Sequence, residues 1–308
     1  MGQSQKRHYS VHDLVRFTLE GSGDLFDYMD FQFANFYVPD DRRSADKDKI
    51  VVKIRSGAQC STGTTITSRE ERYGRRENDF LWCSQEKIVF INGVKPVREQ
   101  NEVIFEDKFP KMKANLLVDL LFRTKLMVER IQLVHAACVW GNKGAILMPA
   151  WKGTGKTAAC LKLIENGYSF LGDDKVWLSS KGTVYSYPRY VVIKESNIRH
   201  LGQLVDHSLK LKITISKMIR NLKRYIRGKL IWKLIDRLLK VPARHYHIGD
   251  LYPHAQTRGN ASLSNVVYLT KVESVKDIVI KRCDSERTAS AIVNINNVEW
   301  NYQLLDLA

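Results

Sequence analysis

The sequence predicts an α/β fold with a β-rich N-terminal region and a basic helical insertion, and three observations carry this prediction. Residues 1–108 contain short runs of β-branched and aromatic residues separated by turn formers. Residues 144–172 read as a strand, a glycine-rich loop, a helix and a second strand. Residues 205–245 combine apolar helical periodicity with many Lys and Arg residues. We therefore expect two domains, 1–108 and 109–308, with the insertion inside the second.

The first domain is expected to consist of short strands, and a helical segment follows it. Five strands are predicted, at residues 49–54, 64–67, 80–83, 87–91 and 102–105. From Lys111 to Leu133, leucines recur at helical spacing without Gly or Pro, which predicts a helix. This change of pattern sets the domain boundary near residue 108.

The second domain shows the alternation of strands and helices that is typical of α/β units. Strands are predicted at 134–140, 144–150 and 169–172, a helix at 157–166 ending at Gly167, and further strands at 264–270 and 276–280.

Composition excludes several classes of protein. The five cysteines are scattered and form no CxxC pair, which argues against both a disulfide framework and a zinc site. No apolar run approaches the roughly 18–20 residues of a membrane-spanning helix. The polar N-terminal sequence lacks a signal-peptide core, so we expect a cytoplasmic protein.

The net charge of +16 is concentrated in one segment. Between Lys210 and Arg244 the chain has twelve Lys or Arg residues and one acidic residue, Asp236. Three interpretations stay open: a helical insertion packed on the core, a docking surface for an acidic partner, and a helix at the inner membrane surface with Trp232 at the interface. Nucleic-acid binding is disfavoured because few aromatic residues accompany the charges.

A phosphate-binding motif occupies residues 150–157, where Ala150 replaces the first Gly of G-x-x-x-x-G-K-[ST]. The motif follows an apolar strand and opens a helix, so backbone N–H groups and the helix N-terminus favour an anion. Lys156 would bridge the β- and γ-phosphates, and the hydroxyl of Thr157 would bind Mg²⁺. The nucleotide-binding residues are predicted to be Gly153, Thr154, Gly155, Lys156, Thr157 and Ala158.

Two adjacent carboxylates, Asp173 and Asp174, follow one helix and one short strand after the glycine-rich loop. This connection returns them to the strand end beside the phosphates. "GDD" is also good turn chemistry, but two like charges in a turn cost energy unless a cation or a proton-accepting role compensates. We therefore predict a functional role for the pair.

These motifs resemble the catalytic domain of bacterial HPr kinase/phosphorylase and its phosphoenolpyruvate-carboxykinase-like relatives. The shared order is His135-Ala136 on a strand, a hairpin, the loop ending in Lys156-Thr157, a helix capped by Gly167, and Asp173-Asp174. The resemblance covers residues 130–195 and, by strand pattern only, residues 260–308.

The resemblance implies an ATP-dependent phosphotransferase that acts on a hydroxyl. It makes Asp173 the general base, places Lys156 on the β/γ-phosphates, and assigns Mg²⁺ to Thr157 and Asp174. His135 would line the same cavity as a third catalytic residue, although a histidine simply held at a strand end explains it equally well. ATP and Mg²⁺ are thus the expected ligands.

The chain departs from the HPr kinase pattern at Ala150, in its N-terminal region, and in the missing loop that engages HPr. The resemblance therefore points to bacterial peptide-modifying kinases, and the expected acceptor is an acidic peptide, protein or small molecule with a hydroxyl, with serine as the leading candidate. We also expect a homo-oligomer. The alternatives are an ATP-sensing adaptor without catalysis, which would not need Asp173, and another ATP-using reaction such as that of a carboxykinase.

Overall fold

The computed structural model divides the chain into two compact units, which are described separately. The first comprises Met1–Leu133 and Asn297–Ala308, and the second comprises Val134–Asn296. The division falls after the helix that the sequence analysis assigned to the second domain. The structure describes residues 4–39, 50–56, 65–66, 72–76, 79–84, 87–91, 101–193, 211, 214–215, 218, 245–271 and 279–307.

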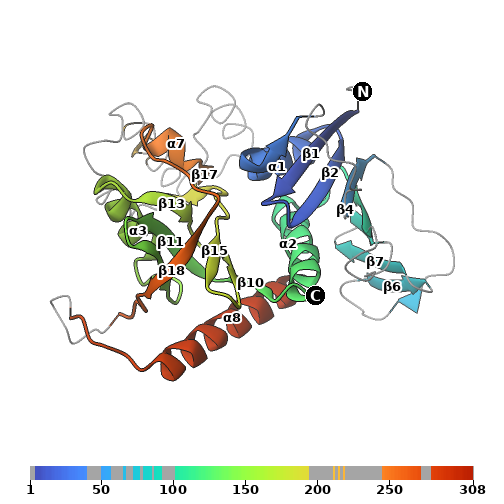
Figure 1. Cartoon of the computed structure of the whole chain (residues 1–308). Helices are drawn as coiled ribbons and strands as arrows, with labels where there is room; N and C mark the ends of the chain where they lie inside the picture. Colours follow the sequence, from blue (N-terminus) through green and yellow to red (C-terminus); the bar gives the residue numbers. More distant parts are fainter. Residues whose placement is uncertain are drawn as a thin grey trace. The chain divides into compact units, whose positions relative to one another are not determined.

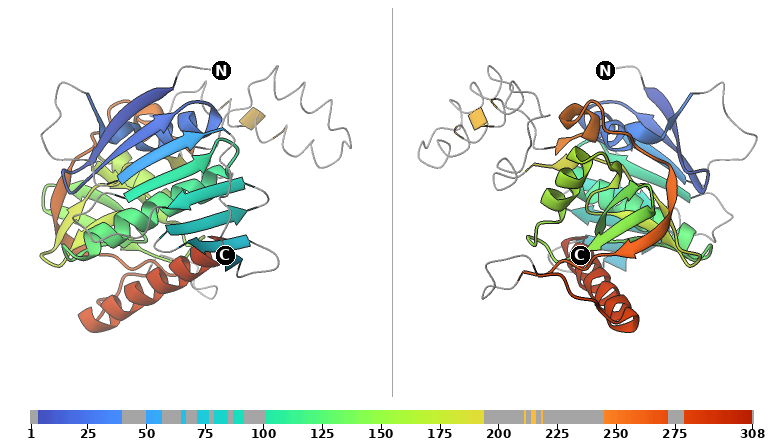
Figure 2. Two further views of the ribbon diagram at one scale, coloured as in Figure 1. Left: turned by 90° about the vertical axis from the view of Figure 1, so that its right-hand side faces the viewer. Right: turned by 60° about the vertical axis from the view of Figure 1, so that its left-hand side comes forward.

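The first unit is built on a nine-stranded sheet, with strand order β3-β1-β2-β4-β9-β8-β7-β6-β5. Successive strands lie side by side in the left view of Figure 2. The strands predicted from the sequence correspond to β4, β5, β7, β8 and β9. The bounds are β1 (Gln5–Val11), β2 (Val15–Gly21), β3 (Tyr37–Val38), β4 (Ile50–Arg55), β5 (Thr65–Ile66), β6 (Arg72–Arg76), β7 (Asp79–Ser84), β8 (Lys87–Ile91) and β9 (Asn101–Glu106).

Two α-helices, α1 (Asp24–Phe33) and α2 (Lys111–Met127), belong to this unit, together with the 3₁₀ helix η1 (Ala34–Phe36). Phe122 of α2 lies 5.2 Å from Phe17 of β2 and 5.8 Å from Phe33 of α1, measured between ring centroids. These contacts explain the apolar face of α2. The predicted helix to residue 133 ends earlier, because Arg130 adopts a positive φ of 55° and a strand begins at the next residue.

The second unit contains a seven-stranded mixed sheet with strand order β10-β14-β15-β18-β12-β11-β13. A strand pair, β16 (Val191–Val192) and β17 (His245–Tyr246), lies outside it. Among the residues described without gaps, this unit also contains the helices α3 (Lys156–Glu165) and α7 (Ile248–Leu251) and the first part of α8 (Ser285–Leu307), whose residues from Asn297 onward belong to the first unit (Figure 1). The sheet strands are β10 (Ile131–Val134), β11 (Ala136–Gly141), β12 (Gly144–Pro149), β13 (Ser169–Gly172), β14 (Val176–Ser179), β15 (Thr183–Tyr185) and β18 (Asn260–Val266).

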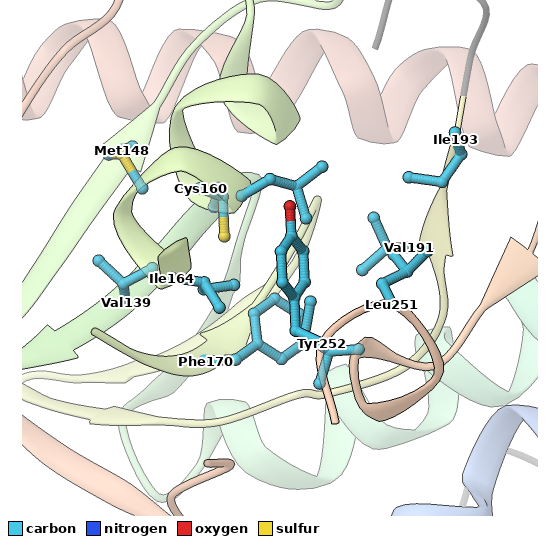
Figure 3. Close-up of a cluster of buried hydrophobic side chains, with 12 residues drawn as sticks. Val139, Met148, Cys160, Ile164, Phe170, Val191, Ile193, Leu251 and Tyr252 are labelled. Atoms are coloured by element: carbon cyan, nitrogen blue, oxygen red, sulfur yellow. The ribbon is translucent and has the colours of Figure 1, made fainter. Parts of the chain in front are cut away.

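Strand β11 is buried on both faces, and its alternate residues enter two different cores. Ala136 and Cys138 join a cluster with residues of β12, β13, β14, β15 and β18. Ala137 and Val139 face the other way, into a cluster that includes Cys160 of α3. Figure 3 shows this second cluster, in which side chains from α3, β13 and the α7 region converge. Because both faces of β11 are buried, the strand has an uninterrupted run of apolar residues instead of an alternation of apolar and polar ones.

The C-terminal part differs from the sequence prediction. The strand expected at 264–270 is shifted toward the N-terminus, to β18 (Asn260–Val266), and the long helix α8 was not anticipated. Of the strand expected at 276–280, residues 276–278 lie outside the described residues, and residues 279 and 280 are exposed and not part of a strand. The mixed α/β class itself is confirmed.

Most of the basic segment lies outside the described residues. Within the segment, residues 211, 214, 215 and 218 are helical and exposed. Across the part of the chain that the structure describes, we find no helix with both the length and the apolar character needed to cross a membrane.

Candidate functional site

One edge of the seven-stranded sheet gathers the residues that the sequence singled out. Strand β11 lies between β12 and β13 and is antiparallel to both, with Ala136 opposite Pro149 and Cys138 opposite Gly172. The carboxyl ends of β12 and β13 therefore meet the start of β11 at this edge. The glycine-rich loop follows β12, the aspartate pair follows β13, and His135 immediately precedes β11.

The glycine-rich loop owes its shape to two left-handed glycines. Gly153 has φ 88° and Gly155 has φ 102°, a region that disfavours residues with a Cβ. A Cβ built on either residue would meet nothing within 4 Å, so the constraint is conformational rather than steric. Thr154 closes the turn, since its N–H and its hydroxyl both donate to the carbonyl of Trp151, at 3.3 and 2.7 Å.

Ala150 shows why the first Gly of the motif can be replaced here. The residue is fully buried and forms a parallel bridge with Leu269. It is not among the described residues with positive φ, so no glycine is required at this position. Its carbonyl accepts a hydrogen bond from Nζ of Lys156 at 2.5 Å.

Lys156 is the first residue of α3 and is only 7% exposed. Its Nζ lies 2.7 Å from Nε2 of His135. Because an ammonium group only donates, Nε2 must accept, which places the ring proton on Nδ1. That nitrogen lies 3.5 Å from Oδ1 of Asp174. Lysine, histidine and aspartate thus form a continuous chain of polar groups.

The two aspartates have different surroundings. Thr157 donates a hydrogen bond of 2.8 Å from its hydroxyl to Oδ2 of Asp173. Within the described part of the chain, Oδ1 of Asp173 is inaccessible and accepts no hydrogen bond. Asp174 is largely exposed, faces His135, and has a positive φ of 74°. The tight turn depends on Gly172, because a Cβ there would lie 2.6 Å from the carbonyl of Lys175.

Burial has a direct electrostatic consequence for Asp173. Desolvation, and then the negative charge of Asp174, raises the pKa of Asp173 from 3.8 to about 6. The hydrogen bond from Thr157 and the charge of Lys156 act in the opposite direction but do not cancel this effect. A carboxyl group with a pKa near 6 is poised to accept a proton near neutral pH.

The donors present suit a cation shared with a phosphate better than a metal bound by protein alone. Mg²⁺ typically binds one or two carboxylates together with substrate phosphates and water. The hydroxyl of Thr157 and the exposed carboxylate of Asp174 offer donors of that kind, and Asp173 lies beside Thr157. Among the described residues there is no group of three or more His, Cys, Asp or Glu side chains placed to hold a metal by themselves.

The sequence motifs predicted that Lys156, Thr157, Asp173, Asp174 and His135 lie close together, and they do. The motifs gave no indication of a further contact, made by Asn296. The backbone N–H of His135 donates to Oδ1 of Asn296 in α8, at 2.8 Å. The two residues are 161 positions apart, and no local motif marks Asn296. Only the three-dimensional packing could have revealed it.

Comparison with known proteins adds no identification. No protein-family model matches the chain, and no curated protein matches its sequence.

Proposed function

We propose that this chain is a Mg-ATP-dependent phosphotransferase, with an HPr kinase-like phosphate-loop domain, that transfers the γ-phosphate of ATP to a hydroxyl group. The carrying observation is the contact between Thr157, in the first turn of α3, and the carboxylate of Asp173, whose Oδ1 accepts no hydrogen bond from the described part of the chain. It places a proton acceptor directly beside the loop expected to hold the phosphates. A protein that only binds nucleotide has no need of such a group.

Each residue then has a defined part in binding. Backbone N–H groups of residues 153–157 hold the phosphates at the N-terminus of α3. Lys156 neutralises charge on the β- and γ-phosphates. Thr157 and Asp174 would hold Mg²⁺, with Asp173 adjacent, and the ion would supply further neutralisation of phosphate charge.

The chemical step assigned to Asp173 is removal of the proton from the acceptor hydroxyl. The acceptor oxygen forms a new bond to the γ-phosphorus while the bond between that phosphorus and the β–γ bridging oxygen breaks. ADP leaves with the bridging oxygen, and the acceptor proton passes to the carboxylate of Asp173. The products are a phosphate monoester, ADP and one proton, so the reaction is balanced.

The resemblance to HPr kinases and to bacterial peptide-modifying kinases supports this reaction class. Since the loop that engages HPr has no counterpart in the sequence, we favour a serine on another peptide or protein, or a small hydroxyl metabolite, as the acceptor. The surplus of Lys and Arg in residues 210–244 supports an acidic acceptor, because clustered cations raise the local concentration of anionic partners. These acceptor properties, a cytoplasmic location and a homo-oligomeric state are all parts of the proposal.

The test is phosphate transfer from γ-labelled ATP by the purified chain to serine-containing peptides encoded beside its gene. Asp173→Asn should retain Mg-ATP binding but lose at least about a hundredfold in transfer rate, the usual scale for a general base. Asp174→Asn should instead raise the Mg²⁺ concentration needed for half-maximal transfer.

Asp24→Asn is the matched control, because its carboxylate lies in solvent in the first unit, with a side chain 94% exposed. Transfer by this control should equal that of the wild type. Normal transfer by both Asp173→Asn and Asp174→Asn would refute the kinase assignment. ATP binding without transfer to any hydroxyl, water included, would favour the nucleotide-sensing adaptor.

A further inference from the structure

His135 stands at a break between two strands that do not pair with each other. Strand β10 ends at Val134 and pairs within the sheet at β14, whereas β11 begins at Ala136 and pairs with β12 and β13. A backbone N–H at such a break needs an acceptor from elsewhere when it is sheltered from water. The side-chain oxygen of Asn296 provides it, 2.8 Å away.

Helix α8 is firmly held where it supplies this side chain. Ile295, the residue before Asn296, is 1% exposed. Ile292, one turn earlier, packs against the core cluster that contains Val134 and Ala136, the two neighbours of His135. The acceptor Asn296 is itself half-buried and lies on the side of the helix that packs against this core.

The orientation of the His135 ring depends on this backbone anchor. Val134 and Ala136 enter the core on one face of the sheet, so His135 between them projects toward the opposite face, as Ala137 does. There its Nε2 accepts the hydrogen bond from Lys156 at 2.7 Å. Its Nδ1 lies 3.5 Å from Asp174. A shift of the His135 backbone would disturb both contacts together.

We propose that Asn296 is a positioning residue that fixes His135 and, through it, the ammonium group of the phosphate-loop lysine. It acts at a distance, through one backbone hydrogen bond, and touches none of the reacting groups. Its effect on the ring is independent of the reaction, whereas its effect on catalysis rests on the proposed phosphotransferase function.

The first experiment measures the histidine ring directly, by NMR of the full chain labelled with ¹⁵N-histidine. The His135 signals are assigned among the eight histidines by their loss in His135→Gln. Lys156→Ala defines the spectrum of a ring that has lost the lysine contact. Asn296→Leu, which removes the acceptor at similar volume, should move the His135 ring nitrogens in the same direction.

Two variants show whether the acceptor or merely the residue matters. Asn296→Asp keeps an oxygen acceptor and should restore the wild-type signals. Asn294→Leu introduces the same side chain at an exposed position on the same helix and should leave them unchanged. Asn296→Ala serves as a second test if Asn296→Leu does not fold. Wild-type His135 signals in a folded variant without the acceptor would overturn the proposal, whether or not the chain transfers phosphate.

The second experiment measures transfer from γ-labelled ATP once an acceptor has been found. Asn296→Leu should lower kcat/KM by about tenfold, on the scale of one lost hydrogen bond to a buried group. Asn296→Leu combined with His135→Ala should be no slower than His135→Ala, because both act through one ring. Additive losses in the double variant, or full activity in Asn296→Leu, would overturn the positioning role in catalysis. A wild type without transfer activity would refute the proposed function. In that case the NMR experiment alone would test whether Asn296 positions His135.

Discussion

Helices α1 and α3 are alike in length and in the way they begin, but their first turns carry opposite charges at the positive end of the helix dipole. Each has ten residues and starts after a glycine with positive φ, 89° at Gly23 and 102° at Gly155. The first turn of α1 contains Asp24 and Asp27. That of α3 has no acidic residue and begins with Lys156.

The difference supports the proposal that an external anion binds at the N-terminus of α3 and not at that of α1. Acidic side chains at a helix N-terminus stabilise it by about 0.3–1 kcal/mol each, and a cation there has the opposite effect. Helix α1 therefore neutralises its own N-terminus, whereas α3 adds positive charge to its N-terminus. A positive charge at this helix end, beside a loop of left-handed glycines, is consistent with the proposed phosphate site.

The largest expected effect comes from removing the cation of α3. Lys156→Ala should abolish the protection against thermal unfolding that Mg-ATP gives the wild type, because the main side-chain charge on the phosphates is lost. A ligand at one hundred times its Kd stabilises by about 2.7 kcal/mol, so the loss is measurable. Lys162→Ala, on the exposed face of the same helix, is the control and should keep full protection. Equal ATP protection in Lys156→Ala and the wild type would mean that α3 is no more a phosphate site than α1.

The second expected effect is a pH-dependent change in the free energy of unfolding, which distinguishes a buried carboxylate from an exposed one. The pKa of Asp173 is raised from 3.8 to about 6, so the folded state binds this proton more tightly than the unfolded state. The stability that this proton provides is fully present below pH 3.8 and is lost as the pH rises through about 6. Asp173→Asn should therefore gain free energy of unfolding relative to the wild type between pH 4 and 7, by up to about 3 kcal/mol.

The measurement is denaturant unfolding at several pH values with EDTA present, so that bound metal does not contribute. Asp24→Asn, which removes an exposed carboxylate of α1, is measured in the same pH series as the control. A constant difference between Asp173→Asn and the wild type across the range would contradict the burial effect.

The third effect separates backbone strain from ligand binding. Gly23→Ala and Gly155→Ala both place a Cβ at positive φ, and in both the new atom meets nothing within 4 Å. Each should lower the free energy of unfolding by about 1–3 kcal/mol. Only Gly155→Ala should also weaken Mg-ATP binding, measured by calorimetry. Equal ATP affinity in the two variants would remove the functional difference between the helix starts.

The smallest effect comes from converting α3 toward the charge pattern of α1. Ala158→Asp adds an acidic residue to the first turn and should stabilise the chain without ATP by about 0.3–1 kcal/mol. The same charge should reduce protection by Mg-ATP, since it repels the phosphates. Ala158→Asn, of nearly the same shape but uncharged, is the control. Tighter ATP binding in Ala158→Asp than in Ala158→Asn would reverse the interpretation of both helices.

Much of the local structure could be predicted from the sequence, because it depends on residues that are close together along the chain. The glycines of the loop, the helix up to Gly167 and the apolar strands on either side follow from backbone preference and periodicity. By contrast, α1, β1 and β2 were not predicted individually, and α8 was not expected at all. In β2, Val15, Phe17 and Leu19 alternate with polar residues, which is typical of a strand, but the pairing of these segments with the rest of the protein depends on packing in the finished fold.

By itself, the sequence determined the glycine-rich loop with Lys156 and the aspartate pair one helix later, since these depend on short-range geometry. The tertiary structure alone decided that β11 lies between β12 and β13, which brings His135 to the same edge as the loop. It also decided that the two aspartates differ, with Asp173 against Thr157 and Asp174 toward His135. The contact of His135 with Asn296 joins residues 161 positions apart. Such contacts depend on how whole helices and strands pack against one another. A local sequence pattern cannot predict that packing.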